Sequence, residues 1–166
     1  MIFLLSGCFS KAKETPKVIF YFDLKGYFTQ LANQLNQQNP TINKSVSKND
    51  NPESKSLKIN NWNEEFALFV NADINKAAWR DSYSKDSSAT KIIYTTKNPD
   101  LKTQKIIIDL TNGKPSHFYV ETKIDNLLYH TTEHLEFYPD SLYEIKKSQK
   151  VILLGNNQYK IIGKFK

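Results

Sequence analysis

Two histidines, His130 and His134, have a spacing that could support metal chemistry. Residues 130–134 read HTTEH, so two imidazoles stand four residues apart with a glutamate between them. On a helix, residues four apart share a face and can hold one metal ion, with the glutamate as a general base. The segment is therefore a candidate for metal-dependent hydrolysis only if it is helical.

The sequence around this segment predicts a strand. The run LLYHTTEHLEFY is rich in β-branched and aromatic residues, which are typical of strands. On a strand, His130 and His134 would lie about 13 Å apart, too far to share a metal ion. We therefore do not expect the match to the H-x-x-E-H pattern of inverted zinc proteases to form a catalytic site.

A hairpin would bring a different pair of histidines together. A two-residue turn at Asp125-Asn126 would place His117 opposite His134, with Glu136 nearby. Directly paired residues have Cβ atoms about 4.5–5.5 Å apart, so His117 and His134 are weak candidates for a metal site. No third protein ligand is secured, so we expect no metal and no cofactor.

The remaining polar residues form no catalytic pattern. No Ser-His-Asp order, phosphate loop or paired-acid motif stands out. Asp109, Glu121 and Glu136 occupy predicted strand positions that face solvent, the usual place for charges. We therefore expect a protein that is not an enzyme, with a hydrolase as the least favoured function.

The segment DINKAAWRDSY connects the predicted helices to the predicted sheet. It carries the only arginine of the chain next to a tryptophan, and both residue types anchor protein interfaces. The candidate interaction patch comprises Asp73, Asn75, Lys76, Trp79, Arg80 and Tyr83. The alternative is that Trp79 packs over the core while Arg80 pairs with a nearby carboxylate.

Composition predicts a single domain that does not bind nucleic acid. The chain has 166 residues, 39% of them hydrophobic, which is enough for a packed core. The net charge is +6, but 22 of the 23 basic residues are lysines. Proteins that read bases and phosphates favour the planar arginine fork, so the lysines indicate a solvated surface with some attraction to anionic lipids.

The apolar pattern predicts helices first and strands afterwards. Apolar residues repeat every three or four positions in 23–37 and again in 62–72, which predicts two helices. A polar hairpin around residues 49–52 separates them, and residues 73–88 are predicted to form a loop or a short helical turn. From residue 89 the apolar period is two, and seven strands are predicted at 90–97, 104–111, 116–124, 127–138, 142–148, 150–154 and 158–165.

These elements predict an α+β fold, with two N-terminal helices packed on one face of a mainly antiparallel, meander-type β-sheet. A three-residue loop at 112–114 would pair Ile108 with Phe118 and Ile106 with Val120. The buried face of the sheet is then predicted to carry Ile106, Ile108, Leu110, Phe118, Val120, Ile124, Leu127 and Tyr129.

The N-terminal sequence MIFLLSGCFSK contains the only cysteine of the chain. Leu5-Ser6-Gly7-Cys8 resembles the lipobox of bacterial lipoproteins, in which an apolar run and two small residues precede the cysteine that accepts a lipid. The chain turns polar directly after Phe9, as a tether does. The seven residues before Cys8 are shorter than a complete secretory signal, so we interpret residues 1–7 as a partial signal peptide. The alternative is a buried strand with Cys8 as a small core residue.

The resemblance implies that Cys8 carries a diacylglyceryl thioether and an acylated amine. Several acyl chains would hold the protein firmly on a membrane. Residues 8–17 would form the lipidated cysteine and its tether, and residues 18–166 the single α+β domain. Phe9, rather than aspartate, after the cysteine resembles the outer-membrane sorting signal of many Gram-negative bacteria. We therefore expect a protein of the bacterial cell envelope, anchored on the outer membrane and facing the periplasm.

These observations favour a non-catalytic binding or scaffold module whose partner is an envelope protein. The alternative is a periplasmic carrier or sensor of an apolar ligand held between the sheet and the helices. An apolar cavity between the two layers would favour the carrier, whereas a solid core and a polar sheet face would favour the scaffold.

We predict that Cys8→Ser, expressed with a complete signal peptide, leaves the membrane fraction and stays folded. The polar tether separates the lipid from the core, so the loss of the acyl chains removes the anchor alone. Labelled palmitate and membrane fractionation measure the outcome. Palmitate incorporation into the Cys8→Ser protein would contradict the assignment.

Overall fold

The structure, a computed structural model, describes residues 19–153 and 155–166 of the chain. The predicted lipobox, Cys8 and the whole predicted tether of residues 8–17 lie outside these ranges. The described elements, in chain order, are α1 (Leu24–Gln38), β1 (Thr41–Lys48), β2 (Asn51–Lys58), α2 (Trp62–Glu65), α3 (Ala67–Asn71), the 3₁₀ helix η1 (Ala77–Trp79), β3 (Tyr83–Ser87), β4 (Lys91–Thr96), β5 (Thr103–Thr111), β6 (Lys114–Asp125), β7 (Tyr129–Tyr138), β8 (Leu142–Val151) and β9 (Gly155–Phe165).

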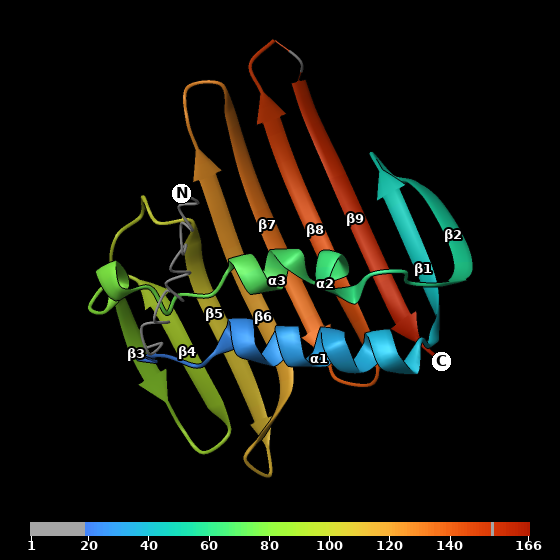
Figure 1. Cartoon of the computed structure of the whole chain (residues 1–166). Helices are drawn as coiled ribbons and strands as arrows, with labels where there is room; N and C mark the ends of the chain where they lie inside the picture. The colour runs from blue at the N-terminus through green and yellow to red at the C-terminus, as the bar shows by residue number, and fades with distance from the viewer. Residues whose placement is uncertain (1–18, 154) are drawn as a thin grey trace, which may run out of the picture.

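The strands form one antiparallel sheet in the order β2-β1-β9-β8-β7-β6-β5-β4-β3. Strands β3 to β9 follow one another as a meander because short turns connect them. The hairpin of β1 and β2 comes earlier in the chain but pairs with β9, so it extends the sheet at the last strand. Helices α1, α2 and α3 all cross the same face of this sheet (Figure 1). The predicted α+β class and the antiparallel meander are confirmed.

Helix α1 forms where the sequence predicted it. Asp23 caps its start, accepting a hydrogen bond of 2.9 Å from the backbone N–H of Gly26. The helix ends at Asn39, which has a φ of 47° and donates its backbone N–H to the Leu35 carbonyl at 2.8 Å. Its buried face, made of residues spaced by three or four, points at the sheet and consists of Leu24, Phe28, Ala32 and Leu35.

The second predicted helix is broken in two. Phe66 has φ −94° and ψ 10°, and this bend separates α2 from α3. The start of α2 is tied to α1, because the Trp62 backbone N–H donates to the Asn36 side chain at 2.9 Å. Trp62, Phe66 and Phe69 are all fully buried, so contacts with α1 and the sheet, rather than a continuous helical ladder, determine the path of this segment. The prediction of two N-terminal helices is therefore corrected to one long and two short helices.

Two strand predictions are also corrected. Residues 83–87, predicted as a loop or helical turn, form β3, which pairs with β4 from Tyr83 opposite Thr96 to Ser87 opposite Ile92. The polar sequence YSKDS concealed this edge strand, because only Tyr83 is buried. The strands predicted at 142–148 and 150–154 are one continuous strand, β8, that ends at Val151.

The register of β5 and β6 agrees with the prediction but has a different cause. Ile108 lies opposite Phe118 and Ile106 opposite Val120, as predicted. The loop, however, contains only Asn112 and Gly113, and both have positive φ. Asp109 pairs with His117, but the next residue, Leu110, pairs with Pro115, so Ser116 is an extra residue that bulges from β6. This bulge, and not a three-residue loop, produces the observed register.

The predicted buried face is confirmed in part. Ile106, Ile108, Phe118 and Val120 are at most 2% exposed, whereas the predicted members Leu110, Ile124 and Tyr129 are half-buried. Leu127 was predicted to be buried but is 90% exposed. The reason is the turn, where the Asn126 side chain accepts hydrogen bonds from the backbone of Leu128 and Tyr129 and so holds residues 126–128 as a loop.

Aromatic rings fill the space between the helices and the sheet. Phe28 of α1 stacks on Phe69 at 4.4 Å between ring centroids, and it meets Phe118 at 5.4 Å and Phe137 at 5.2 Å edge-on. Farther along the sheet, the ring of Tyr143 covers the backbone of Gly163, where a Cβ atom would lie 2.1 Å from the ring. The Tyr143 hydroxyl donates to Glu65 of α2 at 2.5 Å. The core between the two layers is therefore closely packed.

We predict that Phe118→Ala lowers the free energy of unfolding by roughly 3–5 kcal/mol, because the side chain is fully buried and its loss leaves a cavity among other rings. Urea denaturation measures the change. The matched control is Leu127→Ala, a truncation in the exposed loop, which should change the value by less than about 0.5 kcal/mol. Similar losses in both variants would contradict the packing described here.

Candidate functional site

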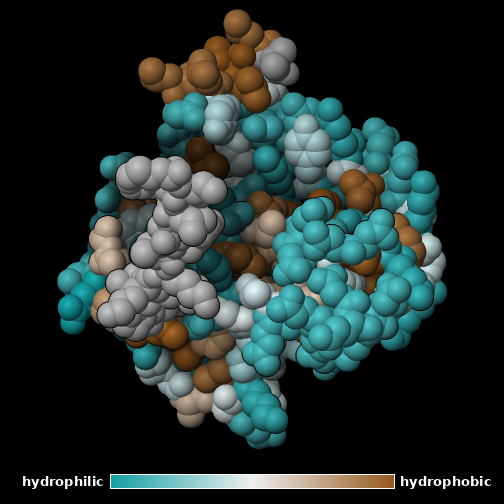
Figure 2. All heavy atoms as spheres, viewed as in Figure 1, coloured by the Kyte–Doolittle hydropathy of each residue, from teal (hydrophilic) through white to brown (hydrophobic). Residues whose placement is uncertain are grey.

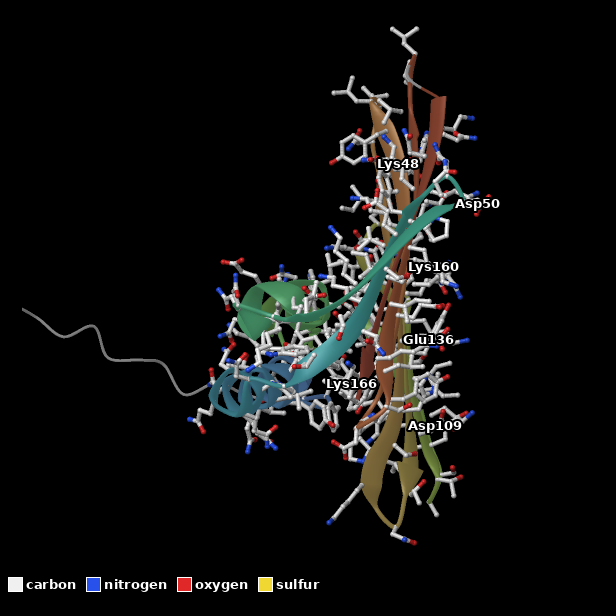
Figure 3. The ribbon with its side chains drawn as sticks, turned by 90° about the vertical axis from the view of Figure 1, so that its right-hand side faces the viewer. Lys48, Asp50, Asp109, Glu136, Lys160 and Lys166 are labelled. Atoms are coloured by element: carbon white, nitrogen blue, oxygen red, sulfur yellow. The ribbon has the colours of Figure 1, made fainter. Side chains whose placement is uncertain are left out.

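The face of the sheet opposite the helices is not covered by any described element. Asp109, Glu136 and Lys160 follow one another along this face, whereas Lys166 lies on the helix side (Figure 3). We call this surface the open face. At its centre, strands β5, β6 and β7 bring together a set of ionisable and aromatic side chains, which we call the open-face network: Asp109, His117, Tyr119, Glu121, His134, Glu136 and Tyr138.

The predicted pairing of His117 with His134 is wrong. The structure pairs Glu121 with His134 and Asp125 with His130, a shift of four residues along β7 from the expected register. The chain reverses direction around Leu127-Leu128 rather than at Asp125-Asn126, because Asp125 pairs with His130 and the Asn126 backbone N–H donates to the Tyr129 carbonyl. An even shift keeps every side chain on its predicted face, so both His117 and His134 remain on the open face but are not cross-strand neighbours.

His117 lies between two carboxylates. Its Nδ1 is 2.8 Å from Asp109 Oδ2, and its Nε2 is 3.7 Å from Glu136 Oε2. Its ring stacks on Tyr138 at 4.3 Å, and the Tyr138 hydroxyl donates to Glu136 at 3.0 Å. Three strands therefore hold this imidazole in one orientation, with Nδ1 donating to Asp109 when the carboxylate is ionised.

Asp109 is a stably ionised member of this network. Its partial burial alone would raise its pKa, but hydrogen bonds from His117 and Lys91 outweigh this effect, so the pKa of Asp109 lies below its ordinary value. The Lys91 Nζ is 3.2 Å from Asp109 Oδ1. Farther along the open face, burial would raise the pKa of Glu144, but Lys146 and Lys160 lower it overall. These acids therefore remain charged near neutral pH.

His134 has a different partner. Its Nδ1 lies 2.7 Å from the hydroxyl of Tyr119, on the neighbouring strand. Burial raises the pKa of Tyr119, and the nearby carboxylate of Glu121 raises it further. Tyr119 thus keeps its proton and connects His134 to the rest of the network. His130 and His134 lie on strand β7, as predicted, so the HTTEH segment has no helical metal-binding geometry.

The open-face network borders a shallow depression of about 410 Å³. Lys91 and Lys105 lie at its β4–β5 side, and Ile107 contributes an apolar floor next to Tyr119. Positive, negative and apolar groups therefore alternate over a short distance. Such a surface offers hydrogen bonds of both kinds and matches a partner of mixed charge better than a uniformly charged one.

The environment of His117 Nε2 bears on what chemistry the network can do. His117 Nε2 is buried and makes no hydrogen bond to the described residues, so within them no nucleophilic side chain is paired with it. The described residues also contain no group of three or more side chains that could hold a metal ion. The arrangement orients an imidazole and presents tyrosines and carboxylates on the open face.

The predicted interaction patch at residues 73–83 lies away from the open-face network. Some of its side chains already bind other residues of the chain. Asn75 accepts hydrogen bonds of 2.9 Å from the backbones of Phe20 and Tyr21, and Asp73 accepts one of 3.0 Å from Lys25. The hydroxyl of Tyr83, which is buried, donates to the backbone of Thr103. Asn75 and Asp73 thus fasten the chain before α1 and the first turn of α1 to the segment after α3, whereas Tyr83 fastens β3 to β5.

The other members of the patch stay at the surface. Lys76 Nζ lies 3.8 Å from the centre of the Trp79 ring, and Arg80 lies over Phe20 at 5.1 Å. Lys76 and Arg80 are exposed and Trp79 is half-buried. An interaction role for this patch therefore stays a prediction, and it now concerns only Lys76, Trp79 and Arg80.

One buried carboxylate was missed by the sequence reasoning. Glu133 points to the helix side, is 4% exposed and accepts a hydrogen bond of 2.9 Å from Thr122. Lys102 and Lys147 approach it at 4.0 and 3.9 Å. A buried charge needs such partners. Side chains alternate between the two faces along β7, and this alternation places Glu133 on the inward face. The sequence therefore contained a signal for this buried carboxylate.

No protein-family model, curated protein sequence or solved structure matches the chain. The interpretation of this site therefore depends on its own geometry.

We predict that Asp109→Asn destabilises the protein at pH 7 but not in acid. The folded-state pKa of Asp109 is lowered, so its contribution is present above the unfolded value near 3.8 and is lost as the pH falls through the folded value. Because the side chain is 32% exposed, we expect a loss below about 1 kcal/mol at pH 7. Urea denaturation at pH 7 and below pH 3 tests this.

The matched control is Asp86→Asn on β3, because Asp86 is exposed and makes no ion pair with any residue that the structure describes. It should change stability little at either pH. An equal loss for Asp109→Asn at both pH values would show that the His117 contact is not ionic.

Proposed function

We propose that this protein is a non-catalytic binding or scaffold module of the bacterial cell envelope, which docks a protein partner on the open face of its sheet. The observation that carries the proposal is the open-face network itself. Seven ionisable or aromatic side chains from three strands are held in place by one another on a surface that no described helix covers. Preorganised polar and aromatic groups of this kind are typical of recognition surfaces.

The packing on the other face supports a scaffold. Rings from α1, α3, β6 and β7 contact one another at 4.4–6.3 Å between centroids and fill the middle of the interlayer space. A carrier of a large apolar ligand would need much of that space to be empty. The core instead supplies a rigid support for the strands that display the open face.

The chemistry of the open face favours a protein partner over nucleic acid. Carboxylates of Asp109, Glu121 and Glu136 lie between the lysines, and these would repel a phosphate backbone. Half-buried apolar and aromatic groups, Ile107 and Tyr119, lie in the same depression. Tyrosine beside mixed charges is common at interfaces between proteins.

The location in the proposal comes from the sequence. The resemblance of residues 5–8 to a lipobox supports a lipid on Cys8, an outer-membrane anchor and a position facing the periplasm. None of the helices in the described part of the chain has the length and hydropathy needed to cross a bilayer. The tether of residues 9–17 would span at most about 30 Å, so the domain would act close to the membrane.

One observation favours the alternative of an apolar-ligand carrier. A groove of about 410 Å³ runs between α1 and the turn after β7, with Tyr27, Leu31 and Phe165 among its apolar lining. Gln34 and Gln38 border it on the helix side. It is large enough for part of an acyl chain or a similar small ligand, so a carrier remains the second candidate function.

We predict that Lys91→Glu combined with Lys105→Glu abolishes recovery of the partner. Both lysines line the depression of the open face, and reversing their charge changes its complementarity. Cross-linking in envelopes followed by quantitative pull-down should show a loss of about tenfold or more. The matched control, Lys25→Glu with Lys55→Glu, makes the same change in net charge on exposed positions away from the open face.

Two outcomes would contradict the proposal. One is equal recovery of the same partner by the open-face variant and by the unmodified protein. The other is an apolar molecule that is extracted from the purified protein in stoichiometric amount and is lost when Leu31→Trp fills the groove, which would establish the carrier instead.

A further inference from the structure

Two neighbouring loops form an apolar tip at one end of the sheet. Strands β6 to β9 extend beyond the helices at this end (Figure 1). Hydrophobic residues gather at this end of the molecule (Figure 2). The tip consists of four exposed residues in the β6–β7 and β8–β9 loops, which are 90%, 70%, 55% and 99% exposed, in order Leu127, Leu128, Ile152 and Leu153. Soluble proteins rarely expose four adjacent large aliphatic side chains without a partner for them.

Several backbone groups at the tip are paired within the tip itself. The Ile152 backbone N–H donates to the Leu128 carbonyl at 3.1 Å, which joins the two loops. The Asn126 side chain accepts the backbone N–H groups of Leu128 and Tyr129, and the Asn126 N–H donates to the Tyr129 carbonyl. Each backbone group that is paired in this way enters an apolar medium at a lower cost than an unpaired one.

Leu153 has an unusual backbone conformation for its residue type. Its φ is 73°, in the left-handed region that leucine adopts only at a cost. Its side chain is 99% exposed, so no contact within the described residues repays that cost. Strain that displays a hydrophobic side chain to solvent points to a function outside the folded domain.

Polar groups below the tip have the charge and order of a membrane-interface belt. Tyr129 is half-buried directly below the leucines, where an amphipathic ring suits the headgroup region. Lys123 and Lys150 lie lower on the same strands, and both are exposed. Asp125 is engaged by Lys123 at 3.0 Å and by His130, and Asp100 lies in the same depression together with Lys102. The belt therefore carries a positive balance, which complements anionic lipid headgroups.

We propose that this tip inserts into the surface of an anionic lipid bilayer, with Leu127, Leu128, Ile152 and Leu153 entering the acyl boundary and the lysines contacting headgroup phosphates. The convex shape of the tip favours lipid over a protein, because a soft bilayer accepts a protruding tip whereas a protein partner would need a matching groove. Insertion uses a different surface from the open face, so partner docking and membrane contact can occur together.

The test uses the full chain with Cys8→Ser, so that no acyl chain supplies the binding. Sedimentation with vesicles of phosphatidylethanolamine and phosphatidylglycerol should show binding, and vesicles of phosphatidylcholine alone should bind less. Raising the salt from about 0.1 M to 1 M should weaken the binding by screening the lysines, without abolishing it.

The decisive variant is Leu127→Asn combined with Leu153→Asn. Both side chains are at least 90% exposed, and asparagine accepts a positive φ better than leucine, so the thermal unfolding midpoint should stay the same or rise. Vesicle binding should fall by about tenfold or more, since each leucine contributes through the apolar surface that it buries. The control, Ile19→Asn with Val46→Thr, changes two exposed apolar residues outside the tip and should bind as before.

A fluorescent reporter adds an independent measurement. Leu128→Trp should show a blue-shifted emission on anionic vesicles and quenching by lipids labelled near the headgroup. Equal vesicle binding by the Leu127→Asn, Leu153→Asn protein and its parent would overturn the proposal. So would a parent that is dimeric in solution and becomes monomeric in this variant without any vesicle binding, which would make the tip a contact between copies of the chain.

Discussion

The aromatic seam between α1 and strands β6 and β7 is the contact on which the rest of the structure depends. Phe28 is its centre, because it touches rings from α2–α3 and from the sheet at once. Each such pair adds about 0.5–1.5 kcal/mol beyond the burial of its surface. The seam joins one helical layer to one face of the sheet, so it leaves the other face uncovered. A nine-stranded sheet with helices on only one face must carry side chains that tolerate water on its other face.

The open face meets this requirement with paired charges. His117 between Asp109 and Glu136, and Glu144 between Lys146 and Lys160, let the sheet carry many ionisable groups without leaving like charges opposed. The same pairing restrains the side chains, so the charged surface of the sheet is also ordered. The tip has the opposite character, because its leucines have no such compensation within the described residues.

Several features could be predicted from the sequence because they depend on neighbours in the chain. Helix α1 has a capping aspartate, a regular apolar spacing and an Asn-Pro end, and all three act locally. The period of two from residue 89 onward predicted the meander, and alternation assigned Asp109, His117 and Glu136 to the solvent face. Even the incorrect turn at Asp125 kept the faces right, because an even change of register moves pairs without turning side chains over.

Contacts between distant residues decided the rest. The bend at Phe66 arises because three aromatic side chains are buried against α1 and the sheet. The apolar spacing of residues 62–72 predicts one helix and gives no sign of this bend. The pairing of β1 with β9 joins segments more than a hundred residues apart, and no local signal specifies it. The neighbour of His117 on β7 changed from His134 to Tyr138 because the position of the β6–β7 turn sets the register, and this position depends on how the whole sheet packs. Sequence alone determined which residues of a strand share a face of the sheet, since strand alternation is a property of the backbone. Only the tertiary structure decided which of them meet, since meeting depends on register across strands.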